Sequence, residues 1–250
     1  MQQNLYDNET FFNQYRELRE NPASYNVLLE QPALHRMLPP LAGKQVLDLG
    51  CGFGDGCVGY LALGAAHVTG IDLSQNMIET AQKNNPRAKI TYICMDMTKI
   101  EDLQETFDVI ISSLAIHYIR DFQGLADSVF RCLKPGGKFV FSQEHPLTTA
   151  CSSYGNWQRD ETGKCIYYKL DGYCRPGKRT VTWMDCTVQK YHRTFSQIIS
   201  QLLCAGFQVE AMQEPVPTQE NIRQVPRMYR EYDKPSFLLL RAGKPAENMK

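Results

Sequence analysis

A glycine-rich turn between two carboxylates is the part of the sequence best suited to bind a ligand. Residues 50–54 read Gly-Cys-Gly-Phe-Gly, with Asp48 before them and Asp55 after them. Glycine lets a backbone approach a ligand closely and adopt dihedrals that a side chain would forbid. Two carboxylates would oppose the pyrophosphate of a dinucleotide, an anion that helix N-termini otherwise attract. The residues therefore favour a ligand carrying an ammonium and a sulfonium, as S-adenosylmethionine does, over NAD.

Two further acids follow apolar runs of the sequence. Asp72 ends the run at 67–72, at about the separation from the glycines where an acid meets ribose hydroxyls. A carboxylate can accept hydrogen bonds from both hydroxyls. The alternative is an acid at a helix N-terminus, because Ser74 is a suitable cap for a helix there. Asp96 follows the run at 89–94 and is either a second ligand contact or an ordinary turn residue.

Candidates for proton transfer follow the fourth and fifth apolar runs. His117 comes shortly after 107–113, and Glu144-His145 follows 138–142. Open α/β sheets hold ligands at the carboxyl ends of their strands. We therefore expect a general base and its orienting partner among these three residues. The alternatives are that His117 only packs in the core and that Glu144 and His145 only shape the acceptor pocket.

A fourth candidate lies near the end of the chain's polar middle section. Tyr191, His192 and Arg193 precede a helix that begins near Thr194. They either contact an anionic acceptor or pair with Glu214, and Tyr191 is the one we include among the catalytic candidates.

The elements needed to position these residues alternate along the chain. Short apolar runs, read as strands buried on both faces of a sheet, are separated by segments with helical periodicity. Strands are expected at 46–49, 67–72, 89–94, 107–113, 138–142, 207–212 and 236–242. Seven strands with five interleaved helices predict a doubly wound α/β fold. Residues 218–234 are expected to be charged and mobile, and the tail from 243 to 250 to be loose.

From Gly43 to Pro146 the sequence resembles the class I S-adenosylmethionine-dependent methyltransferases, more closely the small-molecule enzymes of the type 11/25 group. Residues 46–56 match motif I, and residues 114–118 match the motif IV region. The resemblance implies a Rossmann-like seven-stranded sheet whose last strand is inserted antiparallel. It also implies that Asp96 accepts from the adenine amino group and that the Met97 amide donates to the ring. The residues expected to contact the cofactor are Asp48, Gly50, Cys51, Gly52, Gly54, Asp72, Leu73, Met77, Asp96, Met97, Ser112 and Ser113.

Segments on either side of this core are expected to cover the ligand. Residues 1–42 are read as a helical lid, with Tyr6, Tyr15 or Arg16 contacting ligand; the alternative is that its aromatics only pack. Residues 147–192 hold both tryptophans and several tyrosines. They are read as an inserted cap of short strands and loops over the methyl group, or else as a small β-element with its own core. Residues 193–242 complete the sheet, and the whole chain is expected to be one domain.

Departures from the family pattern narrow the expected acceptor. The Asn/Asp-Pro-Pro-Tyr/Phe motif of nucleic-acid amino methyltransferases is replaced by Ser112-Ser113-Leu114-Ala115. No acid-and-lysine set of the catechol-type metal enzymes can be placed. Both observations favour a metal-free transfer to an oxygen, nitrogen or other nucleophile of a small molecule. The alternatives are an RNA or protein methyltransferase, a non-catalytic cofactor-binding module and an NAD(P)-dependent oxidoreductase.

Composition limits the partners and the location. The 250 residues carry 27 basic and 27 acidic side chains, so a nucleic-acid partner is disfavoured. The first twenty residues are polar, and no apolar run is long enough to span a membrane. The nine cysteines are scattered singly, which is typical of reduced thiols and not of a metal site. We expect a cytoplasmic protein, monomeric or homodimeric.

Overall fold

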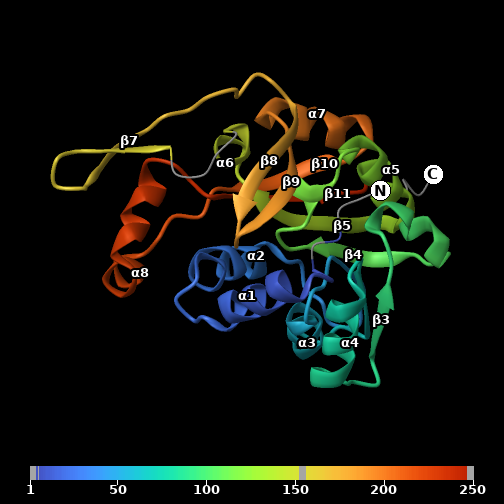
Figure 1. Ribbon diagram of the computed structural model, residues 1–250. Coiled ribbons are helices and arrows are strands. Elements are labelled where there is room, and N and C mark those ends of the chain that lie inside the picture. The colour runs from blue at the N-terminus through green and yellow to red at the C-terminus, as the bar shows by residue number, and fades with distance from the viewer. Residues whose placement is uncertain (1–3, 5, 152–155, 247–250) are drawn as a thin grey trace.

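The computed structural model describes residues 4, 6–151 and 156–246. A seven-stranded sheet at its centre has the order β10-β11-β5-β4-β1-β2-β3 (Figure 1). The strands are β1 (Gln45–Leu49), β2 (His67–Asp72), β3 (Ile90–Cys94), β4 (Phe107–Ser112), β5 (Leu133–Glu144), β10 (Gln208–Gln213) and β11 (Phe237–Gly243). Strands β1 to β5 pair in parallel, whereas β11 is antiparallel to both of its neighbours. The predicted fold and its inserted antiparallel last strand are confirmed.

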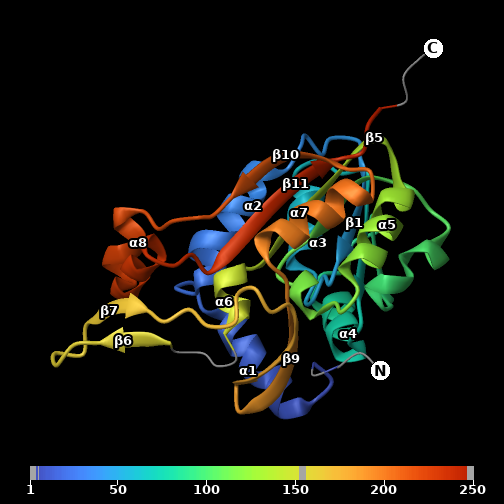
Figure 2. The same ribbon diagram turned by 90° about the horizontal axis from the view of Figure 1, so that it is seen from above.

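The sheet is buried on both faces because its central strands are apolar throughout. In β1, Leu47 and Leu49 face one core, and Val46 faces the other. Helices α5 and α7 cover the first face, and α2, α3 and α4 cover the second (Figure 2). These helices are α2 (Gln31–Met37), α3 (Asp55–Ala62), α4 (Gln75–Asn84), α5 (Phe122–Cys132) and α7 (Phe195–Cys204). Ser74 caps α4 by accepting a hydrogen bond from the Met77 amide. A capped helix therefore begins close to Asp72, as the alternative interpretation of this residue expected.

Short elements follow the carboxyl ends of the strands. They are η2 (Met97–Leu103), η3 (Ile116–Tyr118) and α6 (Pro146–Ala150). Parallel strands bring all of these ends to one edge of the sheet, so residues distant in sequence meet there.

Two segments distant in sequence close over that edge. Helix α1 (Glu9–Glu20) and the π-helical turn η1 (Asn26–Glu30) come from the N-terminal segment, and the hairpin of β8 (Gly177–Trp183) and β9 (Cys186–His192) comes from the insertion. Both views show the hairpin tip beside α1 (Figures 1 and 2). Phe11, Val181 and Val188 are buried together there, with Tyr15 and Trp183 packed against them.

The remaining insertion forms a separate arm beside the C-terminal helices. It consists of the hairpin β6 (Trp157–Arg159) and β7 (Cys165–Tyr168), which extends from the body near α8 (Figure 1). The insertion thus contains the expected short strands, together with the short helix α6.

The expectation for residues 218–234 is wrong in one respect. The segment contains α8 (Gln219–Gln224) and η4 (Pro226–Tyr232), and Met228 and Glu231 are buried. In the predicted tail, Gly243 belongs to β11 and Lys244 donates to backbone carbonyls of α5 and β5; residues 247–250 lie outside the described part. No described helix has the length and apolar character needed to cross a membrane. The cytoplasmic location and the monomeric or homodimeric state stay predictions.

Candidate functional site

The glycine turn after β1 adopts the backbone that its sequence predicts. Gly50, Gly52 and Gly54 have φ values of 76°, 53° and 82°, in the left-handed region. A Cβ on Gly50 would lie 2.7 Å from Cβ of Ala115, so the turn also packs closely against the loop after β4. The Gly52 amide donates to Asp72 Oδ2 at 2.9 Å, which links the turn to the end of β2.

Asp72 is oriented by the backbone around it. Its second oxygen accepts from the Ser74 amide at 2.9 Å. Each carboxylate oxygen retains a second lone pair for a ligand hydroxyl. Burial raises the pKa of Asp72, and the amides of Ser74 and Gly52 act in the opposite direction.

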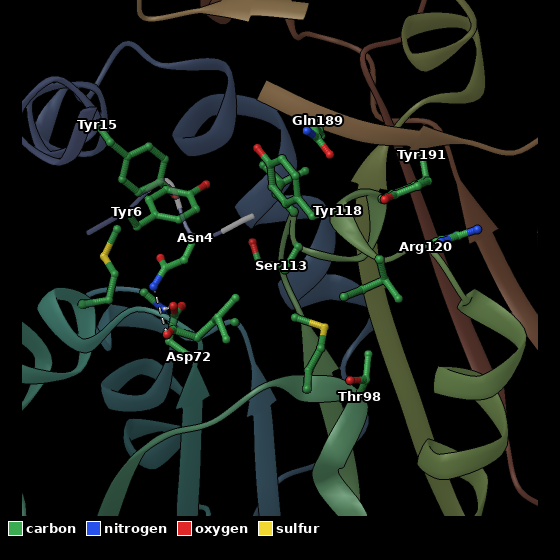
Figure 3. Close-up of a pocket in the computed structure, with 18 of the residues that line it drawn as sticks. Asn4, Tyr6, Tyr15, Asp72, Thr98, Ser113, Tyr118, Arg120, Gln189 and Tyr191 are labelled. Carbon is green, nitrogen blue, oxygen red and sulfur yellow. Dashed lines mark hydrogen bonds between the residues drawn. The ribbon is translucent and has the colours of Figure 1, made fainter. Parts of the chain in front are cut away.

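A main cavity of about 510 Å³ opens from these residues toward η3 and β9 (Figure 3). It contains eight of the sequence-predicted site residues: Gly50, Gly52, Asp72, Leu73, Met77, Met97, Ser113 and Tyr191. Its other walls include Tyr6 and Tyr15 of the N-terminal segment, Gln189, and, after β4, Leu114, Ala115 and residues 118–121.

A smaller cavity of about 150 Å³ adjoins the first, since Tyr15, Gly50, Gly52 and Ser113 line both. Predicted residues Asp48 and Cys51 line it, together with Arg19. Asp48 is buried, and its Oδ2 accepts from the Cys57 thiol at 3.4 Å. Burial raises the pKa of Asp48 to about 7, and the Cys57 hydrogen bond and Arg19 counteract this rise.

Three predicted cofactor residues lie outside both cavity linings. Gly54 packs under the Tyr92 phenol. Ser112 is buried and donates to the Leu49 carbonyl at 2.9 Å. Asp96 caps η2, where its Oδ1 accepts from the Thr98 amide at 2.9 Å.

The two histidine candidates are buried beside the main cavity and do not line it. His117 Nδ1 accepts from the Glu144 amide at 3.4 Å, and His145 Nδ1 accepts from the Leu147 amide at 3.1 Å. Burial lowers the pKa of His117 to about 3 and also lowers that of His145. Both rings are therefore neutral near pH 7 and carry their hydrogen on Nε2. In this tautomer His145 donates to Glu214 Oε1 at 2.8 Å, and neither ring offers a lone pair for a proton.

Glu144 and Tyr191 occupy different environments. The Glu144 carboxylate pairs with Lys190 at 2.5 Å, and the lysine is almost fully buried. Along β9, Val188, Lys190 and His192 face the interior, while Gln189 and Tyr191 face the cavity. This two-residue alternation explains why Tyr191 lines the cavity and its neighbour does not.

The alternative pairing of residues 191–193 with Glu214 is replaced by other contacts. His192 contacts Thr149 Oγ1 and the Tyr173 carbonyl at 2.9 and 2.8 Å. Arg193 donates to the Ile119 carbonyl. Glu214 bonds with His145 instead, as described above.

The sequence did not single out several residues that line the cavities, and one expected ligand contact, Arg16, lies away from them. Arg19, Tyr118, Arg120, Asp121 and Gln189 line the cavities without having been selected. The alternation of β9 around Tyr191 could have identified Gln189, whereas no local signal marks Arg19. Of the lid candidates, Tyr6 and Tyr15 line the main cavity, whereas Arg16 contacts Asn13 and lies over the Phe12 ring.

Comparison with known proteins agrees with this geometry. The family model described as a methyltransferase domain matches residues 47–141. A crystal structure of an S-adenosylmethionine dependent methyltransferase from Mesorhizobium loti is 38% identical, covers 86% of this chain and 97% of its own, and has a TM-score of 0.78. A protein of Haemophilus influenzae, described as uncharacterized, is 37% identical over an alignment of 250 positions that covers 96% of either chain.

Other curated relatives match over less of their length. Phosphoethanolamine N-methyltransferase 1 of Triticum aestivum is 40% identical over 103 residues, 40% of this chain and 21% of that protein. The shared part is thus about a fifth of that relative. Because the methyltransferase of Mesorhizobium loti covers 86% of the chain at 38% identity and the family model matches as well, the chain belongs to the S-adenosylmethionine-dependent methyltransferases, with S-adenosylmethionine as its cofactor.

Proposed function

We propose that this enzyme methylates a small molecule held in the main cavity. The observation that carries the proposal is that one cavity is lined both by expected cofactor residues, such as Asp72, and by a proposed acceptor wall of Tyr118, Gln189 and Tyr191. Its volume of about 510 Å³ lies within the ~300–1,000 Å³ range of small-molecule sites. A nucleic-acid strand would need a basic groove, whereas Arg120 is the one cation among the described lining residues.

The residues that line the two cavities support one orientation of the cofactor. The small cavity pairs a cation, Arg19, with an acid, Asp48, and would hold the carboxylate and ammonium of the methionine part. Asp72 would hold the ribose, and Met97 would lie against the adenine, whereas Asp96 caps η2 behind it, outside the cavity lining. Ser113 lies at the junction of the cavities, where the methionine and adenosine parts meet.

When bound, the cofactor supplies a methyl group that is already activated on its sulfonium. The chain then has to orient the acceptor and exclude water. The described lining residues of the main cavity include no histidine, lysine or cysteine, and the nearby histidines carry their hydrogen on Nε2. Of its two carboxylates, Asp72 is assigned to the ribose, and Asp121 caps α5, where its Oδ1 accepts from the Gly124 amide at 2.9 Å. We therefore propose an acceptor that is nucleophilic without an enzymic base, such as a carboxylate, a thiolate or a neutral amine.

In this scheme the sequence-predicted catalytic residues have different tasks. Tyr191 contacts the acceptor together with Tyr118 and Gln189. His117 and His145 shape the wall behind them, and Glu144 fixes β9 through Lys190. The distances and the burial of each side chain support these roles.

A transfer assay with methyl-labelled S-adenosylmethionine tests the proposal. The enzyme is incubated with a cell extract separated into small molecules, RNA and protein. We expect label in the small-molecule fraction, with a lower rate for Tyr191→Phe or Gln189→Ala. Label in the RNA or protein fraction instead would refute a small-molecule acceptor.

A further inference from the structure

One buried carboxylate close to the site has no part in the scheme above. Glu30 ends the π-helical turn η1 and is 0% exposed. Burying a carboxylate is unfavourable unless hydrogen bonds compensate it. Glu30 has three such bonds: Oε1 accepts from Ser113 Oγ at 2.9 Å and from Ser142 Oγ at 2.5 Å, and Oε2 accepts from Asn26 Nδ2 at 2.6 Å.

The two serines connect Glu30 to the loop that separates the cavities. Ser113 lines both of them. Ser142 Oγ also accepts from the Leu114 amide at 3.0 Å, and Leu114 has a φ of 52°. A non-glycine residue in this region is uncommon and must be held by its surroundings. Glu30 therefore fixes the loop through two adjacent positions.

The asparagine connects Glu30 to the other wall of the small cavity. Asn26 Oδ1 accepts from Arg19 Nη1 at 2.7 Å. Because its amide group donates to Glu30, the amide has one orientation, with its oxygen toward the arginine. The π-helical turn places Asn26 and Glu30 side by side, and such turns are frequent at functional sites.

We propose that Glu30 is a positioning residue for the methionine part of the cofactor, holding Arg19 through Asn26 and Ser113 directly. This inference rests on the proposed placement of that part in the small cavity. The buried Glu30 carboxylate then sets the distance between Arg19, on the N-terminal segment, and Ser113, at the junction of the two cavities. Its substitution should weaken binding of the amino-acid part and leave the adenosine contacts intact.

Two ligands separate these effects in a calorimetric titration. S-adenosylhomocysteine contains the amino-acid part, and 5′-methylthioadenosine lacks it. In Glu30→Gln the side chain keeps its shape but can accept at one end only, so either the serines or Asn26 must face an NH₂ group. We expect at least a roughly tenfold loss of affinity for S-adenosylhomocysteine and less than a roughly twofold change for 5′-methylthioadenosine.

Glu231→Gln is the matched control. Glu231 is also a buried glutamate, it accepts from the amide and hydroxyl of Ser236, and it lines neither cavity. We expect both affinities to stay at the wild-type value in this variant. Equal losses for both ligands in Glu30→Gln, or no loss, would overturn the positioning role.

Arg19→Ala separates this inference from the proposed cofactor placement. A selective loss for S-adenosylhomocysteine in Arg19→Ala but not in Glu30→Gln overturns the role of Glu30 alone. No loss in Arg19→Ala overturns the placement and the inference with it. If Glu30→Gln does not fold, Asn26→Ala cuts the same connection at a half-buried residue, and an unchanged affinity there also overturns the inference.

Discussion

If the proposed cofactor placement holds, Asp48 should make cofactor binding dependent on pH. Burial raises its pKa to about 7, and in the proposed placement its carboxylate faces the cofactor's ammonium. An ammonium binds the charged carboxylate better than the neutral acid. Binding therefore favours the deprotonated form and releases a proton wherever Asp48 is still protonated in the free enzyme.

The size of the effect follows from the pKa. Affinity is proportional to the deprotonated fraction, which falls from about nine tenths at about pH 8 to about one tenth at about pH 6 for a pKa near 7. Over this interval we expect a roughly tenfold loss of affinity, about 1.4 kcal/mol. The effect on folding has the opposite direction. Because the folded-state pKa lies above the unfolded value of 3.8, stability from this group is complete below about pH 4 and is lost as the pH rises through about 7.

Titration of S-adenosylhomocysteine near pH 6, 7 and 8, in buffers with different ionisation enthalpies, measures both affinity and proton release. The wild-type enzyme should release close to one proton at the lowest pH and almost none at the highest. Asp48→Asn should bind more weakly at high pH and lose most of the pH dependence. A flat wild-type profile without proton release, or an undiminished slope in Asp48→Asn, would refute the assignment of Asp48 to the ammonium.

Three other substitutions test the packing around the site. In urea titrations, Gly54→Ala should lower the free energy of unfolding by about 1–3 kcal/mol more than the control Gly43→Ala. Both glycines have a positive φ, but only a Cβ at Gly54 would clash with a neighbouring side chain, the tyrosine at position 92 in β3. His117→Gln should reduce the loss of stability in acid: the neutral ring stabilises the fold fully above about pH 6.5, and this contribution disappears as the pH falls toward its folded-state pKa of about 3, at up to about 1.4 kcal/mol per pH unit. Lys190→Met should lower the free energy of unfolding by about 3–5 kcal/mol in the same assay, because it removes the cation that pairs with the largely buried Glu144 carboxylate. The double variant Lys190→Met with Glu144→Gln should lose less, because it removes both charges. A loss below about 1 kcal/mol in the single variant would contradict this reasoning.

The sheet was predictable because its signals are local. Each central strand is a continuous apolar run, and the glycine turn after β1 has the dihedrals that its composition requires. Asp48 and Asp72 line the cavities because each lies at a strand end close to that turn. Residues whose environment depends on the adjacent sequence could thus be located without a structure.

Contacts between distant segments could not be predicted in this way. Arg19 reaches the cavity because η1 docks on the ends of β4 and β5 through Glu30, and no pattern within 1–42 encodes that contact. His117 and His145 were selected by residue type and strand-end position. Their direction depends on backbone hydrogen bonds that the sequence does not display.

The predicted cap illustrates the same limit within one segment. Its aromatic residues suggested a single cover over the site, yet they belong to two hairpins with different surroundings. The Trp183 ring in β8 packs against the Phe11 ring, with centroids 5.5 Å apart, and so joins the insertion to α1 beside Tyr15, which lines the main cavity. Trp157 in β6 instead packs against Tyr168 and lies under the Arg230 guanidinium, on the arm beside α8. Composition does not distinguish the two tryptophans. The packing of Trp183 against α1 is what brings it close to the site, so the cover depends on the N-terminal helix as much as on the insertion.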